Sequence, residues 1–381
     1  MSASSGNLES SPIHNIRTLN PLEAIQVRPA MYLGDVGVRG LHEMLEVLLI
    51  RALANGNRSM LELDIDIEED NSVIVRGNIG FISTTGEIQT EMQSELTNYK
   101  QATRPYGLSL AVINALSSFL KVTFRVGEKV YHQSYKQGKP ITDLQQGENA
   151  DLKGMVLIHF KPDETLFTEI IFDVQRIAER LWKLACLNQG VCFGLKDNRN
   201  QKKRHETRAY QKFQAKNGLS EFIPTLSSNS TLILSNTFSL NQTGIKIAFN
   251  YQASCIEKVQ CYVNNNLTSW GGTHLTGFRR ALTSSLKSFA RNRGISEAEK
   301  IKGKDFKKGL IAAVSVNLEN ALFEESTKVK LQSPEVVSWV YTKLLKALKL
   351  FWEKYPKQAE IILYKAIKDY DKPLVKNNPR I

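Results

Sequence analysis

The stretch Gly271–Arg279, GGTHLTGFR, has the most sharply specified local structure in the chain. Two successive glycines permit backbone conformations that side chains forbid, so they mark a sharp loop. The apolar spacing that follows predicts a helix over residues 275–291. Elsewhere in the second half of the chain, we expect strands at residues 232–234, 245–251, 261–264 and 310–316 and a long helix at 334–355.

The first half of the chain carries mixed signals of helices and strands. Asn20 is a suitable cap for a short helix, and residues 61–67 alternate apolar and acidic side chains, as a half-buried strand does. Asp64 and Asp66 belong to that alternation, which favours a solvated strand face over a metal site. Helices are expected at residues 21–27, 40–54, 108–119 and 173–187, and strands at 61–67, 72–75, 121–135 and 155–160. Helices on one face of a mixed sheet form an α+β layer sandwich.

The composition is that of a folded, basic protein. The 381 residues, 42% of them hydrophobic, are enough for two domains with separate cores. Fifty Lys and Arg residues against 38 Asp and Glu give a formal net charge of +12. Such an excess favours polyanionic partners such as nucleic acid, although a basic cytoplasmic protein without such a partner has the same composition.

Cysteine spacing and the lack of long apolar segments bear on location. Cys186 and Cys192, like Cys255 and Cys261, are separated by five residues, which matches neither a redox pair nor a zinc ribbon. Free thiols in a reducing compartment are therefore expected. Residues 1–11 lack the pattern of a signal peptide, and no apolar run reaches the roughly 20 residues of a membrane span. We expect no membrane association and a cytoplasmic or nucleoid-associated location.

Three strings that keep their order along the chain resemble one family. They are Arg28–Asp35 (RPAMYLGD), Gly271–Arg279 and Ser326–Leu331 (STKVKL). With them, residues 16–368 resemble the N-terminal ATPase half of the DNA gyrase B subunit and its topoisomerase IV counterpart.

This resemblance implies a two-domain organisation. A flexible arm at residues 1–15 would precede a GHKL (Bergerat) nucleotide-binding domain over 16–215. A transducer domain with a ribosomal-S5-like fold would follow over 216–381 and end in a long helix. In the complete family subunit a Toprim domain comes next. Because the sequence ends at Ile381, we expect the acidic cluster used in DNA cleavage to be absent and the chain to be unable to cleave DNA itself.

The family's first long helix carries a glutamate that activates water and, one turn later, an asparagine that binds magnesium. With one deletion, Glu46 takes the place of the glutamate, and it is the candidate catalytic base. The Asp-Asn pair that should follow becomes Leu49-Ile50, whose aliphatic side chains cannot ligate magnesium, so no metal site is expected. Glu46 reads equally well as an exposed helix carboxylate.

The family's second motif, D-x-G-x-G, supplies an aspartate that accepts a hydrogen bond from adenine. Here it reads RGNIG at residues 76–80. Arg76 has donors and no acceptor, so it cannot replace the aspartate, and its bulk is expected to occupy the base pocket.

The third motif is a glycine-rich lid whose backbone amides hold the triphosphate. Two of its three glycines are replaced here, by Arg104 and Ser109, and Pro105 stiffens the segment. We expect remnants of anion binding at Lys100, Arg104, Gly107, Leu108 and Ser109.

The family's transducer lysine, which reaches the γ-phosphate, is matched by Lys328, although Ser326 stands where the family has glutamine. Lys328 is thus a further candidate ligand of nucleotide or anion. Alternatively, it is an ordinary solvated lysine.

Basic residues gather in the expected transducer domain. In the family this region faces a cavity for duplex DNA, so phosphate neutralisation is one interpretation and an ordinary solvated helix face is the other. The candidate DNA-binding residues are Arg279, Arg280, Lys287, Arg291, Lys304 and Lys307.

Loss of catalytic residues with retention of the core predicts a pseudo-ATPase that binds no cofactor. It would act as a binding or regulatory module on a type IIA topoisomerase, on duplex DNA, or on both, as a homodimer or a heterodimer through the GHKL domain with a gyrase or topoisomerase IV subunit. The alternative is an ATPase subunit of a split type II topoisomerase, which would use ATP, Mg²⁺ and Glu46 and be completed by a Toprim-bearing chain. A third possibility is a pocket that binds a different anion through Arg76, Lys100 and Arg104.

Overall fold

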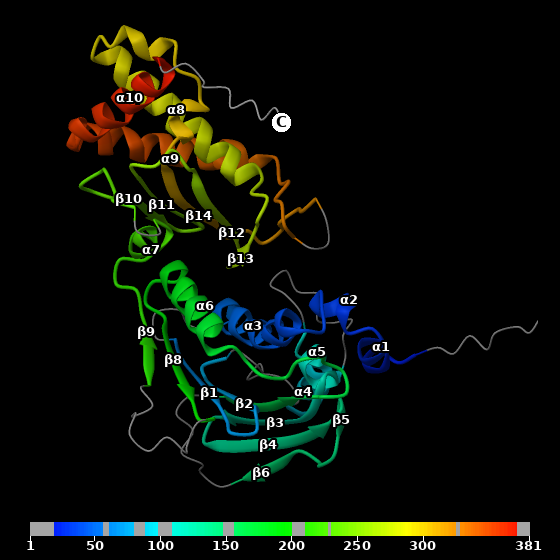
Figure 1. The fold of residues 1–381 in the computed structure, drawn as a ribbon. Coiled ribbons are helices and arrows are strands. Elements are labelled where there is room, and N and C mark those ends of the chain that lie inside the picture. The colour runs from blue at the N-terminus through cyan, green and yellow to red at the C-terminus, as the bar shows by residue number, and fades with distance from the viewer. Residues whose placement is uncertain are drawn as a thin grey trace, which may run out of the picture.

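The computed structural model describes residues 19–55, 61–79, 88–97, 109–147, 156–199, 210–227, 230–324 and 328–371. These residues form two mixed sheets, one in each half of the chain (Figure 1). The strands of the first sheet are β1 (Glu62–Ile67), β2 (Val73–Gly77), β3 (Ser117–Val126), β4 (Lys129–Lys136), β5 (Lys139–Pro140), β6 (Gln145–Gly147), β7 (Val156–Pro162), β8 (Cys192–Asp197) and β9 (Gln211–Phe213).

The first sheet has the order β5-β4-β3-β7-β2-β1-β8-β9, with β6 beside β4. Its pairs are antiparallel except for β1 and β8, which run parallel. Leu63, Ile65, Val73 and Val75 are fully buried and share one face of the sheet, because residues two apart in a strand point the same way. This apolar face is the one that the helices cover.

The helices of the first half lie on that face (Figure 1). Asn20 begins the first of them with a capping box, as expected, and Asp173 caps the last by accepting from the backbone N–H of Arg176. They are α1 (Pro21–Val27), α2 (Ala30–Leu33), α3 (Val38–Asn55), α4 (Ile88–Thr97), α5 (Leu110–Ala115) and α6 (Val174–Leu187).

Two local predictions for this half are wrong. The helix expected at 108–119 ends at Ala115, because β3 begins at Ser117 and pairs with β7; sheet pairing overrides the local helix preference. The aspartates of β1 are not simply solvated. Asp66 is 7% exposed and forms an ion pair with Arg76, and Asp64 accepts a hydrogen bond from the Tyr210 hydroxyl at 2.6 Å.

The second sheet has the order β10-β11-β14-β12-β13. One of its faces is covered by long helices, as Figure 1 shows, and the Trp352 indole N–H donates to Ser285 Oγ (3.2 Å) between two of them. The elements are α7 (Leu219–Leu226), β10 (Phe238–Gln242), β11 (Ile245–Tyr251), β12 (Lys258–Val263), β13 (Asn266–Leu267), α8 (Thr273–Asn292), η3 (Ser296–Glu299), η4 (Asp305–Lys307), β14 (Leu310–Val316), α9 (Glu335–Lys354) and α10 (Pro356–Asp371).

The two halves share part of one core. Phe222 and Ile223 of α7 are buried together with residues of the first sheet, and Ala248 and Ile311 of the second sheet belong to the same apolar cluster. The expected boundary between residues 215 and 216 falls between β9 and α7; the expected arm at 1–15 lies outside the described residues. Within the described ranges, no helix has both the length and the apolar composition needed to cross a membrane.

Candidate functional site

One face of α3 carries Val47 and Arg51, each one residue after Glu46 and Ile50, the positions that the resemblance singles out. These residues are four apart in an uninterrupted helix, so they lie on one face. A terminal nitrogen of Arg51 lies 2.7 Å from Oε2 of Glu95 on α4, and both side chains are largely buried. This ion pair turns one face of α3 toward α4, the helix that precedes the expected lid in sequence.

Magnesium does not fit this face of α3. Magnesium takes hard oxygen ligands, whereas Val47 offers none and Arg51 supplies a positive charge. Nε of Arg51 is buried and has no hydrogen-bond acceptor among the residues that the structure describes. Among the described residues, no group of three or more His, Cys, Asp or Glu side chains is placed to hold a metal ion.

Glu46, the candidate base, points to a neighbouring element. Arg180 of α6 donates from Nε to Glu46 Oε2 at 2.8 Å and also binds Oε1 through a terminal nitrogen. The same guanidinium donates to the backbone carbonyl of Asn265 (3.0 Å), next to β13. Both oxygens of a carboxylate bound in this bidentate way are engaged by the guanidinium. The geometry therefore gives Glu46 a structural role.

Glu43 lies one turn before Glu46 and was not singled out from the sequence. The pKa of Glu43 is raised from 4.5 to about 7, chiefly by burial and then by the neighbouring Glu46, although Arg180, Arg39 and Arg176 act to lower it. The i, i+3 spacing of the two glutamates was the available signal. Arg180, the partner of Glu46, lies on an element about 130 residues away, and no local pattern reveals such a contact.

Arg76 does not occupy the space between sheet and helices, contrary to the expectation from the sequence. Its register partner is Asp64, and its side chain binds Asp66 on the face of the sheet opposite the helices. The end of β2 presents Gly77 to the helix side. Since a Cβ at Gly77 would clash with the carbonyl oxygen of Glu62, no side chain fits there. Gly77 has no side chain, so it is this glycine, and not the bulk of Arg76, that leaves the helix side of β2 without an acceptor for adenine at this position.

The expected anion-binding remnants are only partly described. Lys100, Arg104, Gly107 and Leu108 lie outside the described residues. Ser109 is buried and caps α5, where its hydroxyl accepts from the N–H of Ala111 at 3.0 Å. The Ser109 hydroxyl therefore helps to begin a helix.

Lys328 lies in the loop between β14 and α9, half-buried and with a positive φ of 56°. Within the described residues, no hydrogen bond or ion pair joins Lys328 to α3 or α5. The role expected for it at a phosphate remains a prediction.

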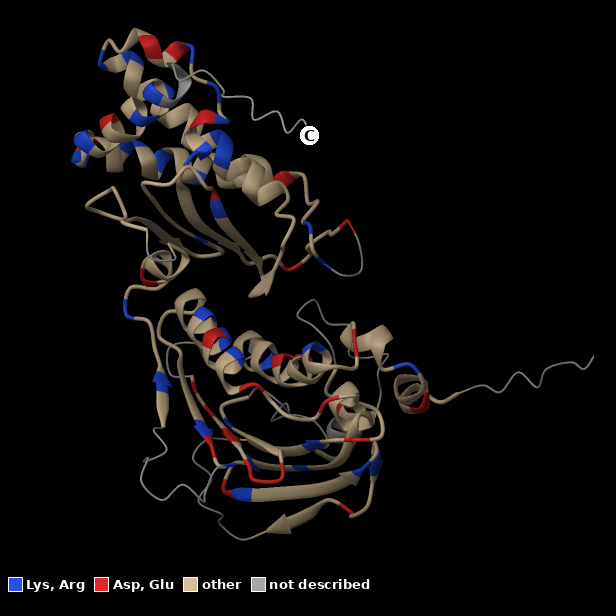
Figure 2. Cartoon of the chain, in the orientation of Figure 1, with Lys and Arg blue, Asp and Glu red and all other residues tan. Residues whose placement is uncertain are grey.

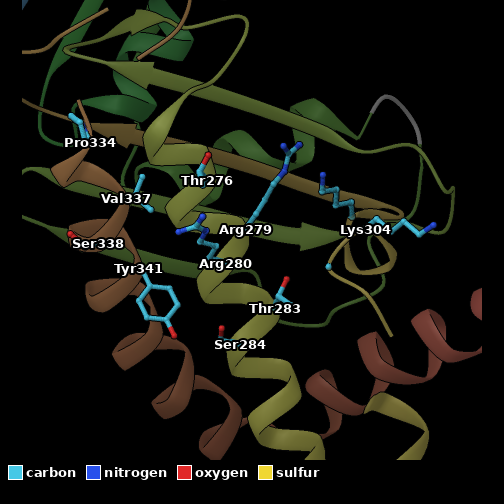
Figure 3. A pocket seen from close by; sticks show the side chains of 12 residues that line it. Thr276, Arg279, Arg280, Thr283, Ser284, Lys304, Pro334, Val337, Ser338 and Tyr341 are labelled. Carbon is cyan, nitrogen blue, oxygen red and sulfur yellow. The ribbon is translucent and has the colours of Figure 1, made fainter. Parts of the chain in front are cut away.

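The second half carries a hollow of about 840 Å³, which we call the basic hollow (Figure 3). It brings together Arg279, Arg280, Lys304 and Lys307, four of the six candidate DNA-binding residues. Lys287 and Arg291 lie farther along α8 and do not line it. Figure 2 shows that basic residues are frequent over the helices covering the second sheet. The other lining residues are Thr276, Thr283, Ser284, Gly303, Pro334, Val337, Ser338 and Tyr341.

Only one of the four cations of the basic hollow has a carboxylate partner among the described residues. Arg279 donates to Oε1 of Glu257 at 2.8 and 3.2 Å. Arg280, Lys304 and Lys307 form no ion pair within the described ranges, and no acidic side chain lines the hollow. The part that α9 plays in the basic hollow was not predicted from the sequence, although Pro334, Val337, Ser338 and Tyr341 have the spacing of one helix face.

Comparisons with known proteins agree with this fold. Residues 218–379 match the family model described as DNA gyrase B. The DNA gyrase B subunit of Cytophaga hutchinsonii is 37% identical over 276 residues, which are 71% of this chain and 57% of that protein. Its counterpart in Staphylococcus epidermidis is 31% identical over 379 residues, 92% of this chain and 57% of that protein. The chain thus spans 57% of the length of these relatives.

Solved structures have the same fold. The 43K ATPase domain of Thermus thermophilus gyrase B, solved with an aminocoumarin, matches with a TM-score of 0.76 and 26% identity over 92% of this chain and 95% of that one. The topoisomerase IV ATP-binding domain of Francisella tularensis matches with a TM-score of 0.73 at 22% identity over 92% and 96%. The latter supports the α+β fold alone.

Proposed function

Since this chain resembles the N-terminal ATPase half of the DNA gyrase B subunit in sequence and fold, we propose that it is a pseudo-ATPase that acts by binding. The observation that carries the proposal is the ion pair between Arg51 and Glu95. It puts a guanidinium, which cannot ligate magnesium, on the face of α3 that meets α4. Val47, one turn earlier, is apolar and cannot act as a base.

Metal-dependent hydrolysis of ATP needs an oxygen ligand for magnesium and a base for the attacking water. Here the candidate base Glu46 is bound by Arg180, and Gly77 has no acceptor for adenine. The three changes, at Glu46 and Arg51 of α3 and at Gly77 of β2, lie on two elements. Their combination supports loss of ATP turnover more strongly than any one of them.

The partners that we propose are duplex DNA and the B subunits of type IIA topoisomerases. The formal charge of +12 and the cations of α8 favour a polyanion. Dimerisation through the first domain, with a second copy or with a gyrase or topoisomerase IV subunit, would let the chain retune strand passage without hydrolysing ATP.

Calorimetric titration with a non-hydrolysable ATP analogue tests the proposal. We expect no magnesium-dependent heat at millimolar analogue, and no ATP turnover above that of a buffer blank. Saturable binding that requires magnesium, together with turnover that is lost in Glu46→Ala, would overturn it. A matched variant, Glu179→Ala on the exposed side of α6, controls for general effects of removing a carboxylate.

The alternative is an ATPase subunit of a split topoisomerase, completed by a separate chain. The match to the 43K ATPase domain of Thermus thermophilus gyrase B extends over 92% of this chain, and this extent of shared fold favours the alternative. It requires the magnesium-dependent binding that the titration measures, so the same experiment decides between the two.

A further inference from the structure

The basic hollow is a groove with a floor and two walls. Thr276, Arg280 and Ser284, each four residues apart, form a stripe along α8, which is the floor. Val337, Ser338 and Tyr341 of α9 form one wall, as Figure 3 shows. The backbone around residues 303–307 forms the other, and it packs closely, because a Cβ at Gly303 would lie 3.2 Å from Thr283 Oγ1.

The groove combines three kinds of group. Arg280, Lys304 and Lys307 supply positive charge without ion-pair partners among the described residues. Hydroxyl groups come from Thr276, Thr283, Ser284 and Ser338, and the aromatic ring comes from Tyr341.

Two carboxylates beside lining residues, Glu257 and Asp305, are already engaged. Glu257 binds Arg279, and the buried Asp305 lies 3.8 Å from Nζ of Lys308 and accepts from the backbone N–H of Lys302. They do not neutralise the three cations of the groove. The groove therefore attracts an anion and offers it an aromatic surface.

We propose that the basic hollow binds a nucleotide unit whose base is unpaired, with the phosphate on Arg280, Lys304 and Lys307 and the base against Tyr341. Positive side chains that follow a phosphate backbone, interleaved with an aromatic ring, are the combination that binds unpaired nucleotides. The volume of about 840 Å³ lies in the range of pockets for small ligands. In a duplex the faces of the bases are stacked on one another, so a ring in a groove cannot reach them.

This site lies in the second half of the chain and does not depend on the proposed loss of ATP hydrolysis. Two ligands offer a phosphate with an unpaired base: a free nucleotide and a nucleotide within a single strand. The experiment below separates them.

Fluorescence anisotropy with a labelled twelve-residue oligothymidylate tests the proposal. Tyr341→Ala should weaken binding about 5- to 100-fold, the range found for loss of one stacked base, and Tyr341→Phe should bind within about twofold of the wild type because it keeps the ring. Arg280→Glu should also weaken binding at least fivefold. Lys136→Glu makes the same charge change at an exposed position of β4, in the first half of the chain, and should cost less than threefold.

Specificity for an unpaired base is read from the same variants. Binding of a duplex of equal length should change less than twofold in Tyr341→Ala. Thymidine monophosphate without magnesium, added as competitor, separates the sources: displacement at millimolar concentration assigns the groove to free nucleotides, and no displacement assigns it to a strand.

Equal losses for single strand and duplex in Tyr341→Ala, or equal effects of Lys136→Glu and Arg280→Glu, would overturn the proposal. If Tyr341→Ala fails to fold, photocross-linking of the wild type to a 5-iodouracil oligonucleotide gives the answer. We expect a cross-link at Tyr341, and a cross-link pattern that avoids α8 and α9 would refute the site.

Discussion

Arg180 of α6 donates a hydrogen bond to the backbone carbonyl of Asn265, 3.0 Å away, and so joins the helices of the first half to the second sheet. The same guanidinium binds both carboxylate oxygens of Glu46 on α3. Asn188 adds a hydrogen bond to Oδ1 of Asn265 at 2.9 Å. One arginine thus fixes α3, α6 and the loop before β13 relative to one another.

Removal of the carboxylate should destabilise the whole chain. Glu46→Ala leaves the guanidinium of Arg180 largely buried without its counter-charge, and breaking such a pair costs about 3 kcal/mol. Urea denaturation followed by circular dichroism measures this cost. The double variant Glu46→Leu, Arg180→Leu should recover most of it, because no charge is then left unpaired. A cost below about 1 kcal/mol for Glu46→Ala would contradict the structural role of this pair.

The pKa of Glu43 predicts a dependence of stability on pH. Because this pKa rises from 4.5 in the unfolded chain to about 7 in the fold, the folded state binds the extra proton between these values. Stability therefore falls as the pH rises from about 4.5 to 7, by an amount of the order of 3 kcal/mol. Glu43→Gln should remove this penalty, so its advantage in unfolding free energy over the wild type should grow between pH 5 and pH 8.

The comparison between variant and wild type isolates Glu43 from other groups. His274, whose pKa burial lowers to about 4, changes stability in the opposite sense between pH 4 and 6.5, but it is present in both proteins. A difference between Glu43→Gln and wild type that stays constant from pH 5 to 8 would show that the carboxyl has an ordinary pKa.

Close packing of α8 on α9 predicts the effect of a single methyl group. A Cβ at Gly277 would lie 2.7 Å from the backbone oxygen of Val337 and 3.0 Å from Cβ of Val340. Alanine is favoured over glycine within helices by about 1 kcal/mol, yet here overpacking should win, with a net loss of about 1 to 3 kcal/mol. Thermal unfolding measures it. Ser288→Ala, at an exposed position of the same helix, should be neutral or slightly stabilising, and an equally stable Gly277→Ala would contradict the packing.

Binding of duplex DNA should depend on cations of α8 outside the basic hollow. Arg291→Glu should weaken binding of a 20-base-pair duplex and lower the slope of log K against log salt by about 1, since one phosphate contact is lost. Filter binding between 50 and 200 mM salt gives both quantities. Lys136→Glu, the same charge change at an exposed position of β4, is the control. Equal effects of the two variants would indicate net charge alone.

Local patterns predicted much of the fold. The apolar alternation at residues 61–67, the possible cap at Asn20 and the amphipathic pattern of residues 173–187 predicted β1, α1 and α6, because each depends on neighbours in sequence. The helix expected over 108–119 was cut short by pairing with β7, an interaction about 40 residues away. Elements without a strong apolar period, such as α4 and β8, were not predicted.

The site was less accessible from sequence, because its contacts join distant elements. Glu46 was placed as a base by its neighbours in α3, but Arg180, which determines its role, lies in α6. Arg76 was assigned to the wrong side, because the sequence string does not say on which face of β2 a residue lies; the register with β1 does. The cations of α8 were predicted, whereas Tyr341 needed the packing of α9 beside them.

The parallel pairing of β1 with β8 has a consequence for synthesis on the ribosome. β1 lies between β2 and β8 in the first sheet, and β8 begins only at Cys192. Until that strand has left the exit tunnel, β1 has an open edge of unpaired N–H and C=O groups, the kind of edge that templates aggregation. Long-range parallel pairing also slows folding. The nascent first half therefore exposes this strand edge until β8 emerges and pairs with β1.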